Sequence, residues 1–159
     1  MQEAILNVFP FKFHLFWNEK GELLKLNFRF SDNLKSGIEY KSNSKVVELI
    51  NHFLKAFLDY WNFRKPRVEV PHLINLTEFE NRIFEKLTKL KIGEIITYKE
   101  LAKRAGFEKA YRAIGQVLAK NPLPLVYPCH RIIGTKGLAG FSQGILIKQF
   151  LIYREIGYV

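Results

Sequence analysis

The spacing of apolar residues changes along this chain from a strand-like pattern to a helical one. Three stretches within the first thirty residues are rich in β-branched and aromatic side chains, which favour extended structure: residues 4–9, 12–17 and 23–30. Residues 18–21 between the last two stretches are predicted to form a hairpin turn. Over residues 46–60 the apolar positions recur at helical spacing. The first part of the chain is therefore predicted to be a small antiparallel sheet with one helix.

Helix start signals dominate the second part of the chain. Residues 77–80 and 97–100 each have a Thr followed three residues later by a Glu, the capping-box pattern that satisfies exposed backbone N–H groups. We expect the first of these helices to end at Gly93. Gly106 should end the second helix, and a third is predicted over residues 109–119. A further helix is expected from about residue 144 to residue 155, packing through Ile145, Leu146, Phe150 and Leu151.

Two short helices joined by a tight turn that contains Gly are typical of a helix-turn-helix. Residues 97–136 carry eight basic and two acidic side chains, and the whole chain has a net charge of +10. A strong positive charge favours nucleic acid or another acidic surface as the partner. The second part of the chain is therefore predicted to bind DNA.

Prolines at positions 66 and 71 interrupt the pattern between the two parts. We predict an α/β protein with a small N-terminal antiparallel sheet-plus-helix lobe over residues 1–70. A linker at residues 71–76 would join it to a C-terminal, mostly helical, winged helix-turn-helix-like lobe over residues 77–159. No apolar run of about 18 residues and no signal-peptide pattern occurs, so we expect a cytoplasmic protein without membrane contact.

The chain has a single cysteine, Cys129, which excludes an intramolecular disulfide and any metal site that needs two thiolates. The four histidines show no ligand spacing, so no metal is predicted. Three prolines fall within seven residues of the preceding loop and should stiffen it into a pre-organised pocket. A lone cysteine in an apolar stretch is often an inert core residue. The positive charges of His130 and Arg131, which follow directly, are expected instead to favour the thiolate.

The sequence around Cys129 resembles the active-site signature of the O6-alkylguanine-DNA alkyltransferases, also called methylated-DNA–protein-cysteine methyltransferases. The resemblance covers residues 77 to 155 and includes five segments in the order of the family: residues 95–102, 112–115, 121–124, 128–133 and 140–142. Residues 1–76 match only in general character, as expected for the variable N-terminal lobe of this family.

The resemblance implies that Cys129 takes an alkyl group from O6 of guanine in one irreversible step that needs no cofactor. His130, through a bound water and with Glu155 behind it, would remove the thiol proton. Tyr98 would donate a proton toward guanine N3, and Asn121 would brace the turn that leads to the cysteine loop. Because a thioether is a poor leaving group, each molecule would act once.

The resemblance also implies a pocket for the base. Pro124 would line the space for the alkyl group, and Ser142 would donate a hydrogen bond to O6. The backbone carbonyls of Cys129 and Ile132 would accept hydrogen bonds from the exocyclic amine and so select guanine. Phe141 stands where the family often has Tyr, and Gln143 where a small residue is common.

The damaged nucleotide would have to be flipped out of double-stranded DNA to reach the cysteine. Arg112 would fill the position that the flipped nucleotide leaves in the base stack, and Tyr98 would help to rotate the nucleotide. The helix that carries Arg112, Ala113 and Gly115 would lie in the minor groove, where phosphate contacts serve binding without sequence choice. The protein is expected to be a monomer.

Three other interpretations stay open at this point. A damage-recognition protein of similar fold would bind alkylated bases without removing the lesion, but relatives of that kind lack the cysteine. A helix-turn-helix transcription factor would need sequence-selective major-groove binding. A Cys–His hydrolase would need an oxyanion hole, which the sequence does not locate. Activity on O4-alkylthymine and the preferred size of the alkyl group also stay open.

Overall fold

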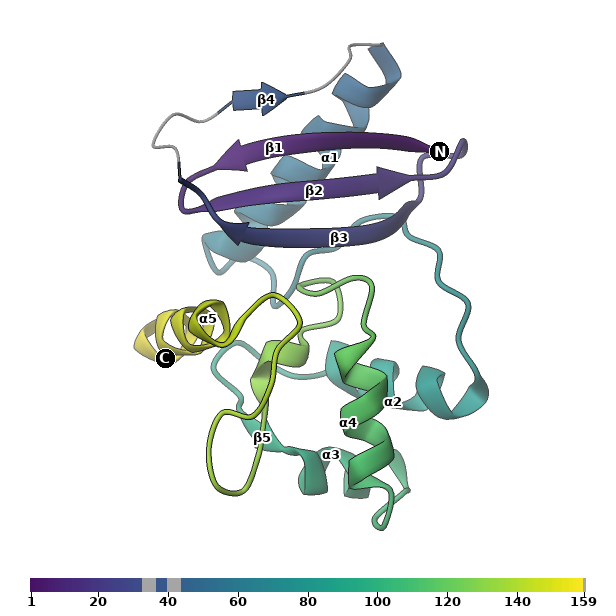
Figure 1. Ribbon diagram of the computed structural model, residues 1–159, viewed down its shortest axis with the longest axis vertical. Coiled ribbons are helices and arrows are strands. Elements are labelled where there is room, and N and C mark those ends of the chain that lie inside the picture. Colours follow the sequence, from purple (N-terminus) through teal and green to yellow (C-terminus); the bar gives the residue numbers. More distant parts are fainter. Residues whose placement is uncertain (33–36, 40–43, 159) are drawn as a thin grey trace. The chain divides into compact units, whose positions relative to one another are not determined.

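The protein, seen in a computed structural model that describes residues 1–32, 37–39 and 44–158, divides into two compact units (Figure 1). The first unit is Met1–Ile74 and the second is Asn75–Val159. None of the described helices has both the length and the apolar character needed to cross a lipid bilayer.

A four-stranded antiparallel sheet covered by one helix forms the first unit (Figure 1). The strand order is β3-β2-β1-β4, and the elements are β1 (Gln2–Val8), β2 (Phe11–Trp17), β3 (Leu23–Phe30), β4 (Gly37–Glu39) and α1 (Ser44–Trp61). Every second residue of β2 is buried, as expected for a strand with one face on the core. The centre of the Phe13 ring lies 5.2 Å from the centre of the Phe53 ring and 4.8 Å from that of the Phe57 ring. Aromatic contacts therefore join the sheet to α1.

The three strands predicted from the sequence are present, with ends that differ by at most two residues. The short strand β4 was not predicted, because three residues are too few to show an alternating pattern. Residues 71–73 run beside the start of β3, since Leu23 N donates to Pro71 O (2.8 Å) and Leu73 N donates to Leu23 O (3.1 Å).

The second unit is mostly helical. Its elements are α2 (Glu78–Thr88), β5 (Ile96–Thr97), α3 (Tyr98–Ala105), α4 (Tyr111–Ala119), the 3-10 helix η1 (Cys129–Arg131), β6 (Ile132–Ile133) and α5 (Ile145–Tyr158). Both halves of the predicted capping box start α2: Glu80 N donates to Thr77 Oγ1 (3.2 Å), and Thr77 N donates to Glu80 Oε2 (2.8 Å). The helix ends at Thr88, earlier than the predicted end at Gly93.

Helices α3 and α4 form the predicted helix-turn-helix. Glu100 N donates to Thr97 Oγ1 (3.1 Å), but the Glu100 carboxylate accepts from Arg104 Nε (2.9 Å), so α3 starts with half of the predicted capping box. Gly106 ends α3 in the left-handed conformation (φ 81°), which suits a residue without a side chain.

A two-residue parallel pairing places the helix-turn-helix beside the cysteine loop. Ile96 of β5 pairs with Ile132 of β6. Tyr98 directly follows β5, and Cys129 lies just before β6, so this pairing brings two distant parts of the sequence to one place. Both strands are anchored by the apolar core of the unit, to which Ile96, Leu101, Ile114 and Ile132 belong.

Helix α5 presents a different face to the core from the one predicted. Its buried residues are Ile147, Lys148, Leu151, Ile152 and Glu155. Of the residues expected to pack, only Leu151 is buried, whereas Ile145, Leu146 and Phe150 are exposed. The prediction was wrong because it chose apolar residues on another side of the helix. The buried face combines three apolar residues with Lys148 and Glu155, whose charged groups form hydrogen bonds inside the unit.

Candidate active site

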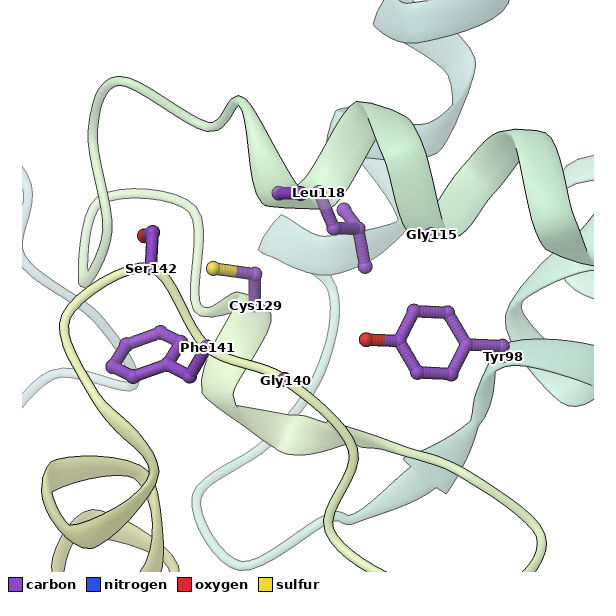
Figure 2. Close-up of a pocket in the computed structure, with 8 residues that line it drawn as sticks. Tyr98, Gly115, Leu118, Cys129, Gly140, Phe141 and Ser142 are labelled. Carbon is purple, nitrogen blue, oxygen red and sulfur yellow. The ribbon is translucent and has the colours of Figure 1, made fainter.

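A cavity of about 350 Å³ opens beside the thiol of Cys129 (Figure 2). Its walls come from the start of α3, the inner side of α4, the cysteine itself and the loop before α5. The residues that line it are Tyr98, Gly115, Leu118, Ala119, Cys129, Gly140, Phe141 and Ser142. Figure 2 shows the hydroxyl end of Tyr98 directed toward Cys129. A nucleophile and two hydroxyl groups therefore border one space.

Asn121 holds the thiol from behind. Its Nδ2 donates to Cys129 Sγ (3.1 Å) and to Tyr127 O (3.0 Å), and its Oδ1 accepts from Leu123 N (3.0 Å). The Asn121 side chain is buried, and its carbonyl and both amide hydrogens are engaged within the loop. Asn121 thus fixes the shape of the proline-rich loop and points a donor at the sulfur.

Behind the cysteine, His130 and Arg131 share the carboxylate of Glu155. His130 Nε2 and Glu155 Oε1 are 2.7 Å apart. Arg131 Nε donates to Glu155 Oε2 (2.8 Å), its Nη2 donates to Oε1 (3.1 Å), and its Nη1 donates to Leu90 O (2.9 Å). All three side chains are buried. These hydrogen bonds join the cysteine loop to α5 and to Leu90, which lies two residues after the end of α2.

The charges of this group follow from its hydrogen bonds. Burial opposes ionisation of Glu155, but the hydrogen bonds from His130 and Arg131 outweigh it and hold the pKa of the carboxyl well below its ordinary value. Burial lowers the pKa of His130, so its imidazole is neutral at neutral pH. An ionised carboxylate can only accept, so Nε2 carries the proton and Nδ1 keeps its lone pair. Among the described residues Nδ1 has no hydrogen-bond partner.

The thiol itself is more strongly protonated than the sequence predicted. Burial raises the pKa of Cys129 to about 11, against smaller opposing effects of Asn121 and Lys148. The expectation that His130 and Arg131 would favour the thiolate by their charge was wrong. Burial keeps His130 neutral, and the charge of Arg131 is compensated by Glu155.

The cation that acts on the thiol is Lys148, a residue that the sequence analysis did not single out. Its Nζ donates to Ile132 O (2.6 Å) and Gly140 O (3.1 Å), and the side chain is fully buried. Burial lowers the pKa of Lys148 to about 8, and an ionised Cys129 opposes this shift. A sequence signal existed: Lys148 and Glu155 are seven residues apart, which places both on one face of α5.

Tyr98 is the first residue of α3, and the other residues that were predicted to contact DNA lie on α4. Burial, followed by the charge of an ionised Cys129, raises the pKa of the half-buried Tyr98, so its phenol keeps its proton. Arg112 and Ala113 are exposed at the start of α4. Gly115 lies one turn further along and lines the cavity. The roles assigned to these residues stay predictions.

The predicted pocket residues divide into two groups. Phe141 and Ser142 line the cavity. Pro124 and Ile132 are not among the lining residues: Pro124 pairs with Tyr127 within the loop, and the side chain of Ile132 is buried in the apolar core. Their proposed contacts with substrate stay predictions.

Three residues on the cavity wall were not predicted: Leu118, Ala119 and Gly140. The helical spacing from Gly115 could have indicated the first two.

Comparison with known proteins agrees with this geometry. Residues 78–156 match the model of the 6-O-methylguanine DNA methyltransferase, DNA binding domain. A methylated-DNA–protein-cysteine methyltransferase of Methanosarcina mazei is 44% identical over 87% of this chain and 86% of its own length. Those of Metallosphaera sedula and Kluyveromyces lactis are 38% and 37% identical, over 55% and 84% of this chain. The matches span only 54% and 58% of these two relatives.

Solved structures share the fold of the whole chain. The O6-methylguanine methyltransferase of Mycobacterium tuberculosis aligns with a TM-score of 0.75 at 22% identity, covering 99% of this chain and 94% of that protein. The O6-methylguanine-DNA methyltransferase of Pyrococcus kodakaraensis aligns with a TM-score of 0.67 at 25% identity, covering 96% and 97%. Given this fold and the identity to the M. mazei protein over most of both chains, the chain belongs to the methylated-DNA–protein-cysteine methyltransferase family.

Proposed function

We propose that this protein repairs DNA by transferring an alkyl group from O6 of guanine to Sγ of Cys129, once per molecule. The observation that carries the proposal is the position of the only cysteine on the wall of a cavity, with the buried His130 and Glu155 pair behind it. The family of the chain supports the same reaction.

The reaction is a displacement at carbon. Sγ of Cys129 forms a bond to the alkyl carbon while the bond between that carbon and O6 breaks, and the electron pair of that bond goes to guanine. The thiol proton passes to the free Nδ1 of His130, through one water molecule. Glu155 stabilises the imidazolium that results, as an orienting carboxylate does in catalytic triads. Guanine takes up one proton from the Tyr98 phenol. The proton that His130 took from the thiol then returns to the Tyr98 phenolate through solvent, so both side chains end in their starting state and guanine has gained the thiol proton.

A buried thiol with a raised pKa suits a protein that must react once with the correct substrate. The thiolate forms only when a base is available to take the proton, which limits side reactions of the resting protein. Two groups then stabilise the negative sulfur: the amide of Asn121, which donates to it, and the ammonium of Lys148. Lys148 therefore supplies the positive charge that the sequence analysis assigned to the residues after the cysteine.

The base is proposed to enter the cavity between Tyr98 and Ser142, with the Ser142 hydroxyl donating to O6. The carbonyl of Ile132 accepts from Lys148 Nζ, and we propose that it also accepts from the exocyclic amine of guanine, since a carbonyl oxygen has two lone pairs. Lys148 thereby fixes the direction of the carbonyl that is proposed to select guanine.

Double-stranded DNA is the proposed partner. Helix α4 would enter the minor groove without sequence choice, and Arg112 would fill the space left by the flipped nucleotide. A cytoplasmic location and a monomeric state, as expected from the sequence, complete the proposal. A non-catalytic damage-recognition protein is the alternative that the experiment below must exclude.

The experiment incubates the protein with a duplex that contains one O6-methylguanine and measures the mass of the peptide that carries Cys129. We expect one added methyl group on that peptide and unmodified guanine in the DNA. The variant Cys129→Ala should bind the same duplex and leave the lesion in place. A wild-type protein that binds the duplex but leaves Cys129 unmodified would be a recognition protein, and the proposal would be wrong.

A further inference from the structure

The sheet of the first unit has an outer face, opposite α1, that the proposed reaction does not use (Figure 1). This outer face carries Lys12, His14 and Phe16 of β2 together with their register partners on β1 and β3. The partners are Glu3, Ile5, Asn7, Lys25, Asn27 and Arg29. A cavity of about 370 Å³ opens on this face, and its lining includes Ile5, Lys12, His14, Asn27 and Arg29.

Two cations face each other at this cavity. Lys12 of β2 and Arg29 of β3 are register partners, and both line the cavity. Like charges at directly opposite positions of two strands destabilise a sheet. Arg29 is exposed, and no acidic side chain in the described part of the chain forms an ion pair with it. An anion bound between Lys12 and Arg29 would replace this repulsion by attraction.

The charge of the whole outer face points the same way. Among its side chains that the structure describes, Lys12, Lys25 and Arg29 are basic and Glu3 alone is acidic. Lys25 is exposed and lies opposite Phe16. Positive charge spread along two neighbouring strands suits an extended anion better than a single small ion.

An aromatic surface lies next to the two cations. The centre of the His14 ring is 4.3 Å from the centre of the Phe16 ring, and both residues are partly exposed. His14 follows Lys12 by two residues, which is about 7 Å along the strand. One nucleotide can span this separation, with its phosphate at Lys12 and its base over the rings. Asn27, the register partner of His14, offers an amide donor and an acceptor to the edge of that base.

We propose that the outer face of the first unit binds single-stranded DNA. Lys12 and Arg29 contact a phosphate, and an unpaired base stacks on the rings of His14 and Phe16. Basic surfaces that carry aromatic rings bind single strands in this way without sequence preference. The bases of a duplex are already paired and stacked, so a duplex could use the cations but not the rings. This site shares no lining residue with the cavity beside Cys129.

The binding test uses the whole protein with one equivalent of unlabelled duplex, which occupies the surface proposed for α4. A fluorescent oligothymidylate is added, and its anisotropy reports binding. We expect the duplex-loaded wild type to bind it. Arg29→Gln should weaken this binding roughly tenfold, the effect of one lost charge-assisted hydrogen bond. The same variant should reduce the slope of log affinity against log salt by about 0.7, as expected for one lost phosphate contact of a single strand.

Lys55→Gln is the matched control. Lys55 is exposed on α1, against the opposite face of the sheet, and does not line the cavity. Its removal takes away one charge of the same unit and should change neither the affinity nor the salt slope. Arg29→Gln should unfold at a higher urea concentration than the wild type, because the repulsion from Lys12 is gone. It should also transfer methyl groups to Cys129 at the wild-type rate.

The role of the rings is tested by Phe16→Leu, which keeps an apolar side chain and removes the ring. This variant should bind oligothymidylate severalfold more weakly. A strand of abasic deoxyribose phosphates of equal length should bind wild type and Phe16→Leu equally, and more weakly than oligothymidylate binds the wild type.

Three results would overturn the inference. An abasic strand that binds the wild type as tightly as oligothymidylate would mean that the face attracts any anion and stacks no base. Equal losses for Arg29→Gln and Lys55→Gln would mean that only the net charge matters. Failure of the duplex-loaded wild type to bind oligothymidylate would mean that the outer face binds no single strand.

Discussion

Nε of Arg131 lies 2.8 Å from Oε2 of Glu155, and neither side chain is accessible to solvent. The same carboxylate binds His130 through its other oxygen. Glu155 therefore balances the charge of the arginine and orients the imidazole at once. Because both tasks depend on one buried carboxylate, its removal should affect stability and chemistry together.

We predict that Glu155→Gln destabilises the protein by roughly 3–5 kcal/mol, because the buried Arg131 is left without its counter-charge. The amide also takes away the carboxylate that orients His130, so methyl transfer should slow as well. The free energy of unfolding is measured by urea denaturation, and transfer by the mass of the Cys129 peptide.

Glu94→Gln provides the comparison for this prediction. Glu94 accepts from Arg104 Nη1 (2.6 Å) on the surface of the same unit, where both side chains are partly exposed. Partly exposed pairs contribute about 1 kcal/mol or less. Equal losses for the two variants would show that the buried carboxylate has no special role in stability.

The stability that Glu155 contributes should depend on pH in the acid range. Its pKa in the folded protein is lower than its ordinary value of 4.5, so the unfolded chain takes up the proton first. The contribution is complete above pH 4.5 and is lost as the pH falls through the folded pKa. The difference in unfolding free energy between wild type and Glu155→Gln should thus shrink from neutral pH to about pH 3. A constant difference would mean that the carboxyl is not ionised in the folded state.

Some features could be predicted from sequence because they depend on a few neighbouring residues. The capping box at Thr77 and the left-handed turn at Gly106 are of this kind, since their hydrogen bonds join residues within one turn. Strands β1, β2 and β3 could also be predicted, because each is a run of residues that favour extended structure.

Other features depend on contacts between distant segments. The inward face of α5 is set by hydrogen bonds from Lys148 to Ile132 O and Gly140 O, and no local pattern records such partners. The raised pKa of Cys129 has the same origin, because it follows from burial within the assembled unit. For that reason, the charges of the residues next to Cys129 predicted the wrong direction for the shift of its pKa.

We predict that Lys148→Met slows alkylation of Cys129 by a small probe such as iodoacetamide by about tenfold at neutral pH, equivalent to about one pKa unit. The ammonium stabilises the thiolate only while it is charged, and its pKa is about 8. The ratio of wild-type to variant rates should therefore be largest below pH 8 and fall toward one above it. A ratio that does not change with pH would point to a structural role alone. Thermal unfolding of both proteins checks that the variant folds.

Gly115→Ala should separate stability from function. Gly115 lies inside α4, where Ala favours the helix by roughly 0.5–1 kcal/mol over Gly. An added Cβ would lie 3.7 Å from Cε1 of Tyr98, an ordinary contact, so the variant should fold and be more stable. The new methyl group would enter the wall of the cavity beside Cys129 and crowd the base that is proposed to bind there. Transfer from duplex DNA should therefore slow while the free energy of unfolding rises.

Gly157→Ala is the control for this prediction. The added Cβ, near the end of α5, would have no atom within 4 Å, so this variant should leave transfer unchanged. If Gly115→Ala also leaves transfer unchanged, the substrate does not pass along this wall.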